Sequence, residues 1–303
     1  MTLFYHHEAC ERHDTGAGHP ESAGRLKAVR DAVLTASPKL VQATPEPVAL
    51  ETLIAAHSER HVERLFACSP AEGRVAIDGD TTMMAHSLDA AMLAAGALAG
   101  SVDQVATGQH DKAFCCVRPP GHHAEREQSM GFCLFNNIAV AAYRALNEHG
   151  MKRVAILDFD VHHGNGTEDI FRDDPRVLLC SSFQHPFYPN TNSPNVEGEL
   201  VNVPLPAGTG SDAFRKAIVA TWRPALAEFQ PELILVSAGF DAHVDDPLAG
   251  LNLRDDDYAW LGMHIGEWAA DLCDGRVIAG LEGGYNLAAL GRSAAMFTHA
   301  LGR

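Results

Sequence analysis

The sequence predicts one α/β domain over residues 1–303, built on an open, mostly parallel β-sheet with helices on both faces. Three observations support this fold class. Several short runs rich in Val, Ile, Leu and Cys lack polar alternation, which is typical of parallel strands buried on both faces. Helical stretches lie between many of these runs, as in folds that alternate strand and helix. The length of 303 residues and the hydrophobic fraction of 46% suffice for one buried core.

The expected strands, in chain order, cover residues 113–117, 153–159, 177–181, 200–205, 233–238 and 276–281. The expected helices cover residues 22–36, 137–149, 212–229 and 255–274. Ser22 is the predicted N-cap of the first helix, and Gly150 and Gly275 mark the ends of two others. Residues 186–210, which are rich in Pro and Asn, are predicted to form a long surface loop.

The composition excludes several classes of protein. The 39 acidic and 23 basic residues give a net charge of −16, and a field of that sign repels phosphate backbones, so we expect no nucleic-acid partner. No apolar run reaches the roughly 18 residues of a membrane span, so we expect no membrane insertion. The N-terminus lacks the features of a secretory signal, and the seven scattered Cys residues contain no CxxC pair. These features favour a reduced, cytoplasmic protein.

Unusual polar residues follow four of the expected strands, at the edge of the sheet where ligands bind in such folds. A rigid Pro-Pro-Gly turn after the first strand displays His122 and His123. A Gly-Gly turn after the last strand holds Tyr285 in a defined place. Taken alone, the two histidines fit an ordinary surface loop and Tyr285 fits a packing residue. Their common location at one edge of the sheet favours a functional role.

Asp158, Asp160 and His162 lie at and just beyond the end of the second expected strand, and in an extended chain they share one face because its side-chain period is two. The alternative is a solvated strand end, but three ionisable groups beside a sheet interior are costly unless they are paired or bind a metal. Asp241 follows the fifth expected strand and completes an Asp, His, Asp set without Cys. Three protein ligands and an open position are typical of catalytic zinc, and iron(II) or cobalt would also fit.

Together these segments resemble the zinc-dependent histone deacetylases, which have the arginase–deacetylase fold. The resemblance runs from His19 to Tyr285, and its ordered motifs cover residues 118–124, 131–137, 158–167, 237–241 and 281–286. Asn165 and the Leu-Glu-Gly-Gly-Tyr-Asn segment are similar to the class II branch and its bacterial relatives. Class I members place Asp at position 165, and an amide there leaves the neighbouring imidazole less basic than a carboxylate would.

The resemblance implies one catalytic Zn²⁺, with Fe²⁺ as an alternative, bound by Asp160, His162 and Asp241. It implies that His122 and His123 flank the attacking water, and that His123 is the general base and later the general acid. The choice between the two histidines as proton acceptor stays open. A further implied role is that of the Tyr285 hydroxyl, which polarises the substrate carbonyl and donates to the oxyanion.

The resemblance also implies roles around the reaction centre. Asp158 would orient His122, Gly131 and Phe132 would line a tunnel for the substrate, and Asp80 would accept hydrogen bonds from substrate backbone amides. For Asp80, an ordinary turn residue is an equal alternative. Structural K⁺ ions are expected at two sites. The first would use Asp158, Ser181 and the backbone carbonyls of Asp160 and His162, and the second would use carbonyls around Phe171, Asp174 and Val177.

The expected reaction is the removal of acetyl or other acyl groups from Nε-acyl-lysine in proteins or peptides. An acetylpolyamine deacetylase is the main alternative. Polyamine-specific relatives place Glu seven positions after the last zinc ligand, where this chain has Leu248, which favours lysine. The net charge of −16 leaves room for polyamines. An arginase-like di-manganese ureohydrolase and a non-catalytic acyl-lysine or metal-binding protein fit the motifs less well. Oligomerisation stays open.

Overall fold

Within the described part of the chain, eight strands form one sheet in the order β2-β1-β5-β10-β9-β6-β7-β8, and this order decides which chain segments meet at its carboxyl edge. The structure is a computed structural model and describes residues 2–303. The strands are β1 (Thr2–His6), β2 (Val41–Ala43), β5 (Lys112–Cys116), β6 (Val154–Asp158), β7 (Val177–Gln184), β8 (Leu200–Leu205), β9 (Leu233–Ala238) and β10 (Val277–Leu281). Every pairing between neighbours is parallel. A separate antiparallel hairpin joins β3 (Arg74–Ala76) and β4 (Thr82–Met84).

The central strands are apolar and buried along their whole length, as the sequence predicts. All residues of β6, β9 and β10 are buried, because helices cover both faces of the sheet. The six expected strands are confirmed as β5 to β10, and β7 is longer than expected. The register pairs Asp158 with Ser237 on one side and with Ser181 on the other. Asp158, at the end of β6, is therefore level with Ser237 near the end of β9, which brings the polar segments that follow these two strands together.

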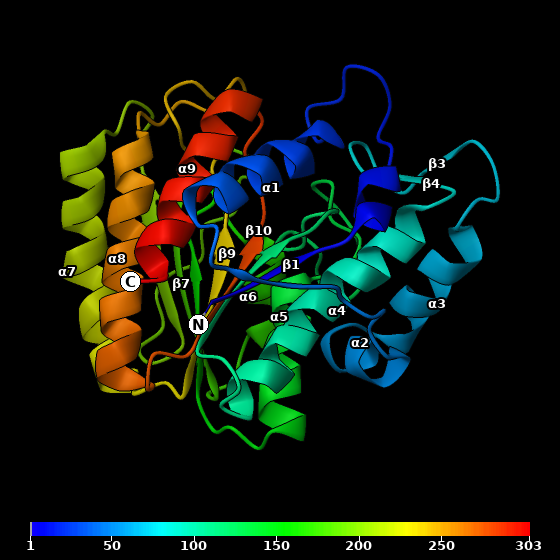
Figure 1. The fold of residues 1–303 in the computed structure, drawn as a ribbon. Coiled ribbons are helices and arrows are strands. Elements are labelled where there is room, and N and C mark those ends of the chain that lie inside the picture. Colours follow the sequence, from blue (N-terminus) through cyan, green and yellow to red (C-terminus); the bar gives the residue numbers. More distant parts are fainter. Residues whose placement is uncertain (1) are drawn as a thin grey trace.

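Two layers of helices enclose the sheet (Figure 1). One layer holds α1 (Gly24–Ala36), α7 (Ser211–Phe229), α8 (Asp255–Leu272) and α9 (Leu287–Leu301). The other holds α4 (Ser87–Ala106) and α5 (Asn137–Tyr143), which continues as a π-helical turn over Arg144–Glu148. Shorter helices complete the fold: α2 (Leu50–Ala56), α3 (Glu59–Cys68), α6 (Asn165–Phe171) and a 3₁₀ turn at Glu8–Arg12. The predicted α/β class, with helices on both faces of a parallel sheet, is confirmed.

The structure corrects several local predictions. Ser22 is not the N-cap of α1, because the helix begins at Gly24 after Ala23 and has no side-chain cap, whereas the Ser22 carbonyl accepts from the Arg25 N–H in the preceding turn. The helix expected over 137–149 loses α-helical geometry after its seventh residue. Gly150 and Gly275 have positive φ just beyond helix ends, as predicted. The loop expected over 186–210 contains β8, which the sequence also predicts.

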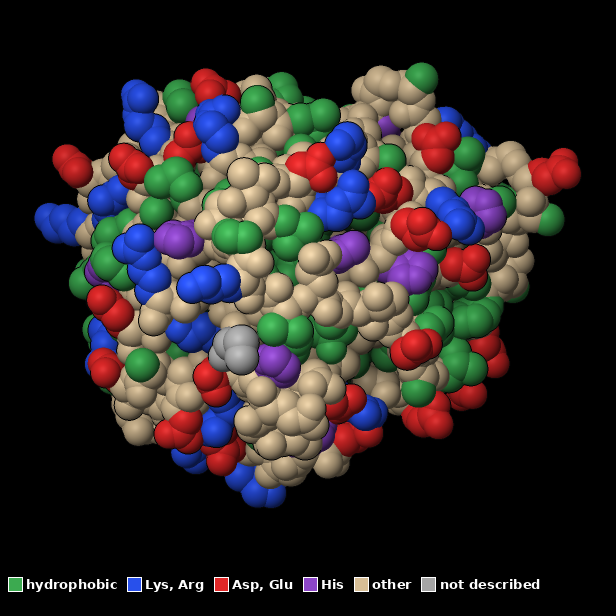
Figure 2. Space-filling model, viewed as in Figure 1, with side chains coloured by type: hydrophobic (Ala, Val, Ile, Leu, Met, Phe, Trp, Pro, Cys, Tyr) green, Lys and Arg blue, Asp and Glu red, His purple; other side chains and the backbone are tan. Residues whose placement is uncertain are grey.

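Among the described residues, no helix is long and apolar enough to cross a bilayer. Figure 2 shows acidic and basic side chains interspersed over the face in view. The described basic side chains on that face do not gather into a continuous patch.

Candidate functional site

The order of the sheet brings the polar segments predicted from the sequence to one place. Strands β5, β10, β9 and β6 are consecutive neighbours, so the segments that follow them meet at the carboxyl edge. These segments carry His122 and His123 after β5, Tyr285 after β10, Asp241 after β9 and His162 after β6. Residues more than 160 positions apart in the chain therefore share one site.

Asp160, His162 and Asp241 converge on one point. One ligand atom of each lies within 4.8 Å of the others. The His162 Nδ1 atom is 3.0 Å from Asp160 Oδ1 and 3.3 Å from Asp241 Oδ2. The remaining carboxylate oxygens are held by the backbone, because Val161 N–H donates to Asp241 Oδ1 at 2.9 Å and Gly283 N–H donates to Asp160 Oδ2 at 2.8 Å. The inward-facing atoms of the three side chains are thus fixed in direction.

The residues of this triad fit a divalent cation. The Asp241 Oδ2 atom is buried and has no hydrogen-bond partner among the described residues, which is costly without a bound ligand. Burial and the charge of Asp160 raise the pKa of Asp241 to about 7. A bound cation would relieve this repulsion between two buried carboxylates. Gly283 has no side chain beside Asp241 Oδ2 and Asp160 Oδ2, and a Cβ there would collide with both oxygens.

His122 is held by two carboxylates behind the triad. Its Nδ1 atom lies 3.0 Å from Asp158 Oδ2, and its backbone N–H donates to Glu282 Oε2 at 3.2 Å. Burial disfavours the charged ring, but the charges of Asp160 and Asp158 outweigh it and hold the pKa of His122 well above its usual value. The pairing with Asp158 therefore favours the charged form of the His122 ring.

His123 has the opposite protonation. Its Nδ1 atom lies 2.7 Å from Asn165 Oδ1, and its ring is 4.0 Å from the His122 ring between centroids. Burial, followed by the charges of His122 and His162, holds the pKa of His123 well below its usual value. At neutral pH the ring is neutral and can accept a proton. The two adjacent histidines therefore differ in what they can do, although the sequence presents them as a pair.

Tyr285 and Leu248 are tied to the same carboxylate. Asp246 accepts the backbone N–H of Tyr285 at 2.7 Å and that of Leu248 at 3.0 Å, one on each oxygen. Burial and the charge of Asp241 raise the pKa of Tyr285 well above its usual value, so its hydroxyl stays a donor. Arg25 lies over the Tyr285 ring at 5.1 Å. Leu248 is 37% exposed, which fits a position at the rim of the site.

Gly131 and Phe132 form one wall beside the triad. Both have positive φ, +57° and +69°, and a Cβ on Gly131 would collide with the His123 ring. Phe132 packs edge-on against the Tyr285 ring at 6.2 Å between centroids. Asp80 Oδ1 accepts the Gly131 N–H at 3.0 Å. Asp80 therefore lies at this wall, and its contact also fits the alternative of a structural turn residue.

The loop before β8 supplies a second wall that sequence reasoning did not identify. The Phe187 ring stacks on the His162 ring at 5.2 Å between centroids. Tyr188 meets the His123 ring edge-on at 5.3 Å, and burial together with the charge of Asp80 raises the pKa of Tyr188 well above its usual value. The aromatic pair in the Pro-rich segment was the available sequence signal, but nothing local relates this segment to the triad.

The residues predicted to bind monovalent cations lie beside β6 and β7. Asp158 is fully buried opposite Ser181, whose hydroxyl has no hydrogen-bond partner among the described residues. Phe171, Asp174 and Val177 form consecutive turns, in which the first two carbonyls accept from the N–H three residues later at 3.0 Å.

Glu282 and Asp246 are site residues that the sequence did not single out. Glu282 is 2% exposed, and it accepts from the backbone of Gly121 and His122 and from the Ser237 hydroxyl. Its neighbours in the glycine-rich segment were the only signal. Its partners are 161, 160 and 45 residues away, so no local pattern could indicate its contacts.

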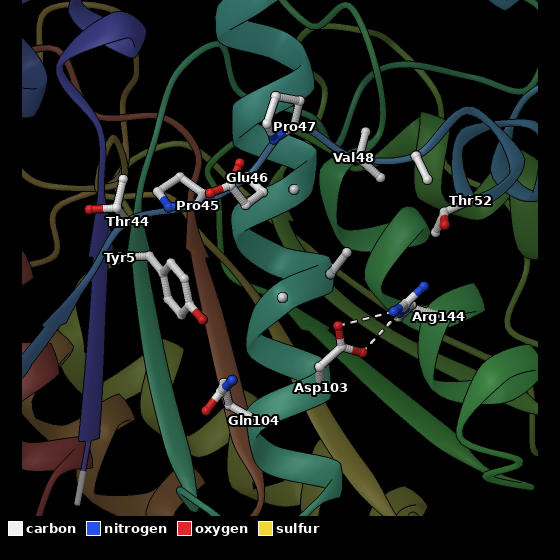
Figure 3. A pocket seen from close by; sticks show the side chains of 14 residues that line it. Tyr5, Thr44, Pro45, Glu46, Pro47, Val48, Thr52, Asp103, Gln104 and Arg144 are labelled. Carbon is white, nitrogen blue, oxygen red and sulfur yellow. Dashed lines mark hydrogen bonds and ion pairs between the residues drawn. The ribbon is translucent and has the colours of Figure 1, made fainter.

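A separate cavity of about 330 Å³ lies over α4 and is bounded by Tyr5, Gly96, Asp103 and Arg144 (Figure 3). The Asp103 carboxylate forms hydrogen bonds of 2.9 and 3.1 Å with the Arg144 guanidinium and one of 2.7 Å with His149. The cavity shares no lining residue with the triad, the tandem histidines or Tyr285. This cavity is therefore distinct from the cluster at the carboxyl edge of the sheet.

The family model and two relatives that match this chain carry names of histone deacetylases. Residues 19–301 match the family model described as "Histone deacetylase domain". "Histone deacetylase 10, chloroplastic" of rice is 42% identical over 91% of this chain and 68% of its own length. A "Histone deacetylase-like amidohydrolase" of Pseudomonas aeruginosa is 39% identical over 89% of this chain and 73% of its own length. The crystal structure of the "HDA15 HD domain" superposes with a TM-score of 0.91 at 35% identity, over 99% of this chain and 89% of that one.

Proposed function

The chain belongs to the histone deacetylase family, and from that premise we propose that it uses one bound Zn²⁺ to hydrolyse Nε-acyl-lysine amides in proteins or peptides. The family is one of deacetylases, is generally metal-dependent and acts on acetylated substrates. The choice of zinc, of lysine and of the individual residues is our proposal. The observation that carries it is the convergence of two carboxylates and one imidazole beside a neutral histidine and a tyrosine hydroxyl.

Asp160, His162 and Asp241 would hold the ion, because their inward atoms converge and one of them is otherwise orphaned. A zinc ion at such a site supplies Lewis acidity, which lowers the pKa of water and polarises the amide carbonyl. Two carboxylates and one imidazole leave a coordination position open, as catalytic zinc sites do. The site contains no Cys ligand, which distinguishes it from structural zinc sites.

His123 is the residue we propose as general base. Its ring is neutral at neutral pH, and Asn165 takes up its Nδ1 atom, so Nε2 remains to accept a proton from the attacking water. The same atom can return that proton to the leaving lysine amine. His122 is already paired with Asp158, which suits an electrostatic and orienting role in place of proton acceptance.

Tyr285 would stabilise the charge that develops on the carbonyl oxygen. Its high pKa keeps the hydroxyl protonated, and Asp246 fixes the backbone that carries it. One donor placed at an oxyanion contributes about 3–4 kcal/mol to transition-state binding in other hydrolases. No covalent intermediate with the protein is needed, because the cluster of His122, His123 and Tyr285 offers a base and a hydrogen-bond donor.

The substrate tunnel would lie between the Gly131–Phe132 wall and the Phe187–Tyr188 wall. An acyl-lysine stem is uncharged, so apolar and aromatic walls suit it. Leu248 at the rim adds apolar contact and no counter-charge for a secondary ammonium, which favours lysine over polyamine. An acetylpolyamine deacetylase is the second candidate, favoured by the net charge of −16. Structural K⁺ at the Asp158–Ser181 place is part of the proposal, supported by the orphaned Ser181 hydroxyl.

One assay panel tests the proposed function. The chain is stripped with a chelator, reloaded with Zn²⁺ or Fe²⁺, and assayed on acetyl-lysine peptides, longer acyl-lysines and acetylated polyamines. We expect metal-dependent hydrolysis with the highest kcat/KM on an acyl-lysine peptide. Turnover that is equal with and without metal would refute the proposed mechanism. A preference for acetylspermidine would replace lysine with the second candidate.

A further inference from the structure

The orientation of Asn165 is set by a carboxylate on its far side. The Asn165 Nδ2 atom donates to Glu125 Oε1 at 2.7 Å, and Asn165 Oδ1 lies 2.7 Å from His123 Nδ1. A side-chain amide has one donor end and one acceptor end, and it can present either to a neighbour. An ionised carboxylate can only accept. Glu125 therefore selects the orientation in which Asn165 turns its oxygen toward His123.

This orientation decides which nitrogen of His123 carries the proton. Because Asn165 Oδ1 is an acceptor, the Nδ1 atom of His123 must be the donor in their hydrogen bond. A neutral imidazole carries one N–H, so Nε2 is left with its lone pair. Nε2 is the atom that the proposed function uses to accept a proton. A flipped amide would reverse the assignment and place the proton on Nε2.

Glu125 is itself held in place from several sides. Its N–H donates to the Gln128 carbonyl at 2.9 Å, and its own carbonyl lies 2.9 Å from His57 Nδ1. The second carboxylate oxygen, Oε2, accepts from Gln128 Nε2 at 2.8 Å. The side chain can therefore keep Oε1 directed at Asn165. Such support is what a residue needs to impose an orientation on its neighbour.

We infer that Glu125 is a positioning residue that fixes the base-competent tautomer of His123 through Asn165. The inference rests on the proposed function, because it presumes that His123 is the proton acceptor. The Glu125 carboxylate accepts from Asn165 and from Gln128, and of these two partners only Asn165 hydrogen-bonds to His123, so Glu125 acts on His123 through the Asn165 amide. The inference adds a third member to a relay that runs from Glu125 through Asn165 to His123.

Replacing the acceptor at position 125 by a donor tests whether Glu125 sets the orientation of Asn165. In Glu125→Lys the ammonium is a donor, so Asn165 should flip and trap His123 with its proton on Nε2. Asn165→Asp should remove the dependence, because a carboxylate at 165 accepts from His123 on one oxygen and from Lys at 125 on the other. Alone, Asn165→Asp places a second carboxylate against Glu125 and should be impaired. The matched control is Glu127→Lys, whose 52% exposed side chain pairs with Arg60 at the surface.

The expected kinetics follow. With full zinc content, Glu125→Lys should lower kcat by roughly 100-fold at nearly unchanged KM. For comparison, a catalytic imidazole held in the wrong tautomer costs another hydrolase about 10⁴-fold in kcat. Asn165→Asp alone should lose about tenfold, and the double variant should return to within about threefold of wild type. Glu127→Lys should match wild type. Losses that multiply in the double variant, or an unimpaired Glu125→Lys, would overturn the inference.

A measurement independent of turnover keeps the two proposals separable. Long-range ¹⁵N–¹H NMR of histidine-labelled, zinc-loaded protein reports which ring nitrogen of His123 is protonated, with His123→Ala for assignment. We expect Nδ1–H in wild type and Nε2–H in Glu125→Lys, and a mixture in Glu125→Met, which serves if the Lys variant does not fold. An unchanged tautomer in these variants overturns the inference. Absence of all hydrolysis by wild type would refute the proposed function while this NMR result still stands.

Discussion

Replacing Leu248 with Glu tests the substrate class that we assign to the site. Leu248 follows the Asp241 loop and shares the Asp246 carboxylate with Tyr285, so its side chain should meet the part of a substrate just outside the scissile amide. An acetylated polyamine carries a secondary ammonium there, whereas the stem of an acyl-lysine is uncharged. Leu248→Glu should therefore shift the preference toward the polyamine by attraction.

The exposure of the side chain sets the size of this shift. Two unit charges 4 Å apart attract by about 4 kcal/mol at an effective dielectric constant of 20. Leu248 is 37% exposed, so solvent screening reduces this value toward the roughly 1 kcal/mol of an exposed ion pair. We take about 1–2 kcal/mol, which corresponds to a 5- to 30-fold change in the ratio of the two kcat/KM values.

The assay compares an acetyl-lysine peptide with acetylspermidine at one salt concentration, in wild type, Leu248→Glu and a control. Val219→Glu is the control, because Val219 is 45% exposed on α7 and adds the same charge outside the site. We expect wild type and control to prefer the peptide equally. A wild type that already prefers acetylspermidine, or a Leu248→Glu ratio equal to that of the control, would refute the reasoning.

Three further predictions concern single residues. Tyr285→Phe should keep its metal but lose about 10²–10³-fold in kcat, and an unchanged kcat would remove the assigned donor role. Asp80→Ala should lower kcat/KM for acetyl-lysine peptides far more than kcat/KM for small acetylated amines. An equal loss for both substrates would indicate a structural role through Gly131. Burial lowers the pKa of His57 to about 3, and its ring accepts the Asn136 N–H at 2.9 Å, so the fold keeps it neutral. In the unfolded chain this imidazole binds a proton below about pH 6.5, whereas in the folded chain it stays neutral down to about pH 3. The contribution of His57 to the free energy of unfolding is therefore complete above about pH 6.5 and decreases as the pH falls toward 3, by about 2 kcal/mol at pH 5. Urea unfolding should show that loss in wild type and not in His57→Gln, and equal pH dependence in both would contradict it.

The sequence predicted the centre of the fold better than its periphery, for a physical reason. Residues 233–238 form a strand with the predicted ends, because an apolar β-branched run buried on both faces has no competing pattern. The strand at Thr2–His6 escaped prediction because it mixes Thr, Tyr and His with apolar residues. Helix α4 is not among the helices that the sequence predicted. Its Gly96 is required by packing, since a Cβ would collide with the Glu46 carbonyl.

The site residues also fall into those that the sequence predicted and those that it did not. The triad and Tyr285 follow strand ends directly, so adjacency to a buried run marked them as unusual. Glu125 and Asp246 act through backbone groups and amides that lie 40 or 39 residues away in the chain. Such contacts depend on strand order, which the sequence pattern does not specify. Ordinary-looking carboxylates in loops therefore gain their roles only once the sheet is assembled.

Metal content tests the central claim most directly. Elemental analysis of the purified wild type should find about one divalent metal ion per chain, and Asp241→Ala should lose both this metal and the hydrolysis of acyl-lysine peptides. Asp245→Ala is the matched control, because its 57% exposed side chain lies on the same loop outside the triad, and it should keep both. Full metal content in Asp241→Ala would contradict the proposed ligand set.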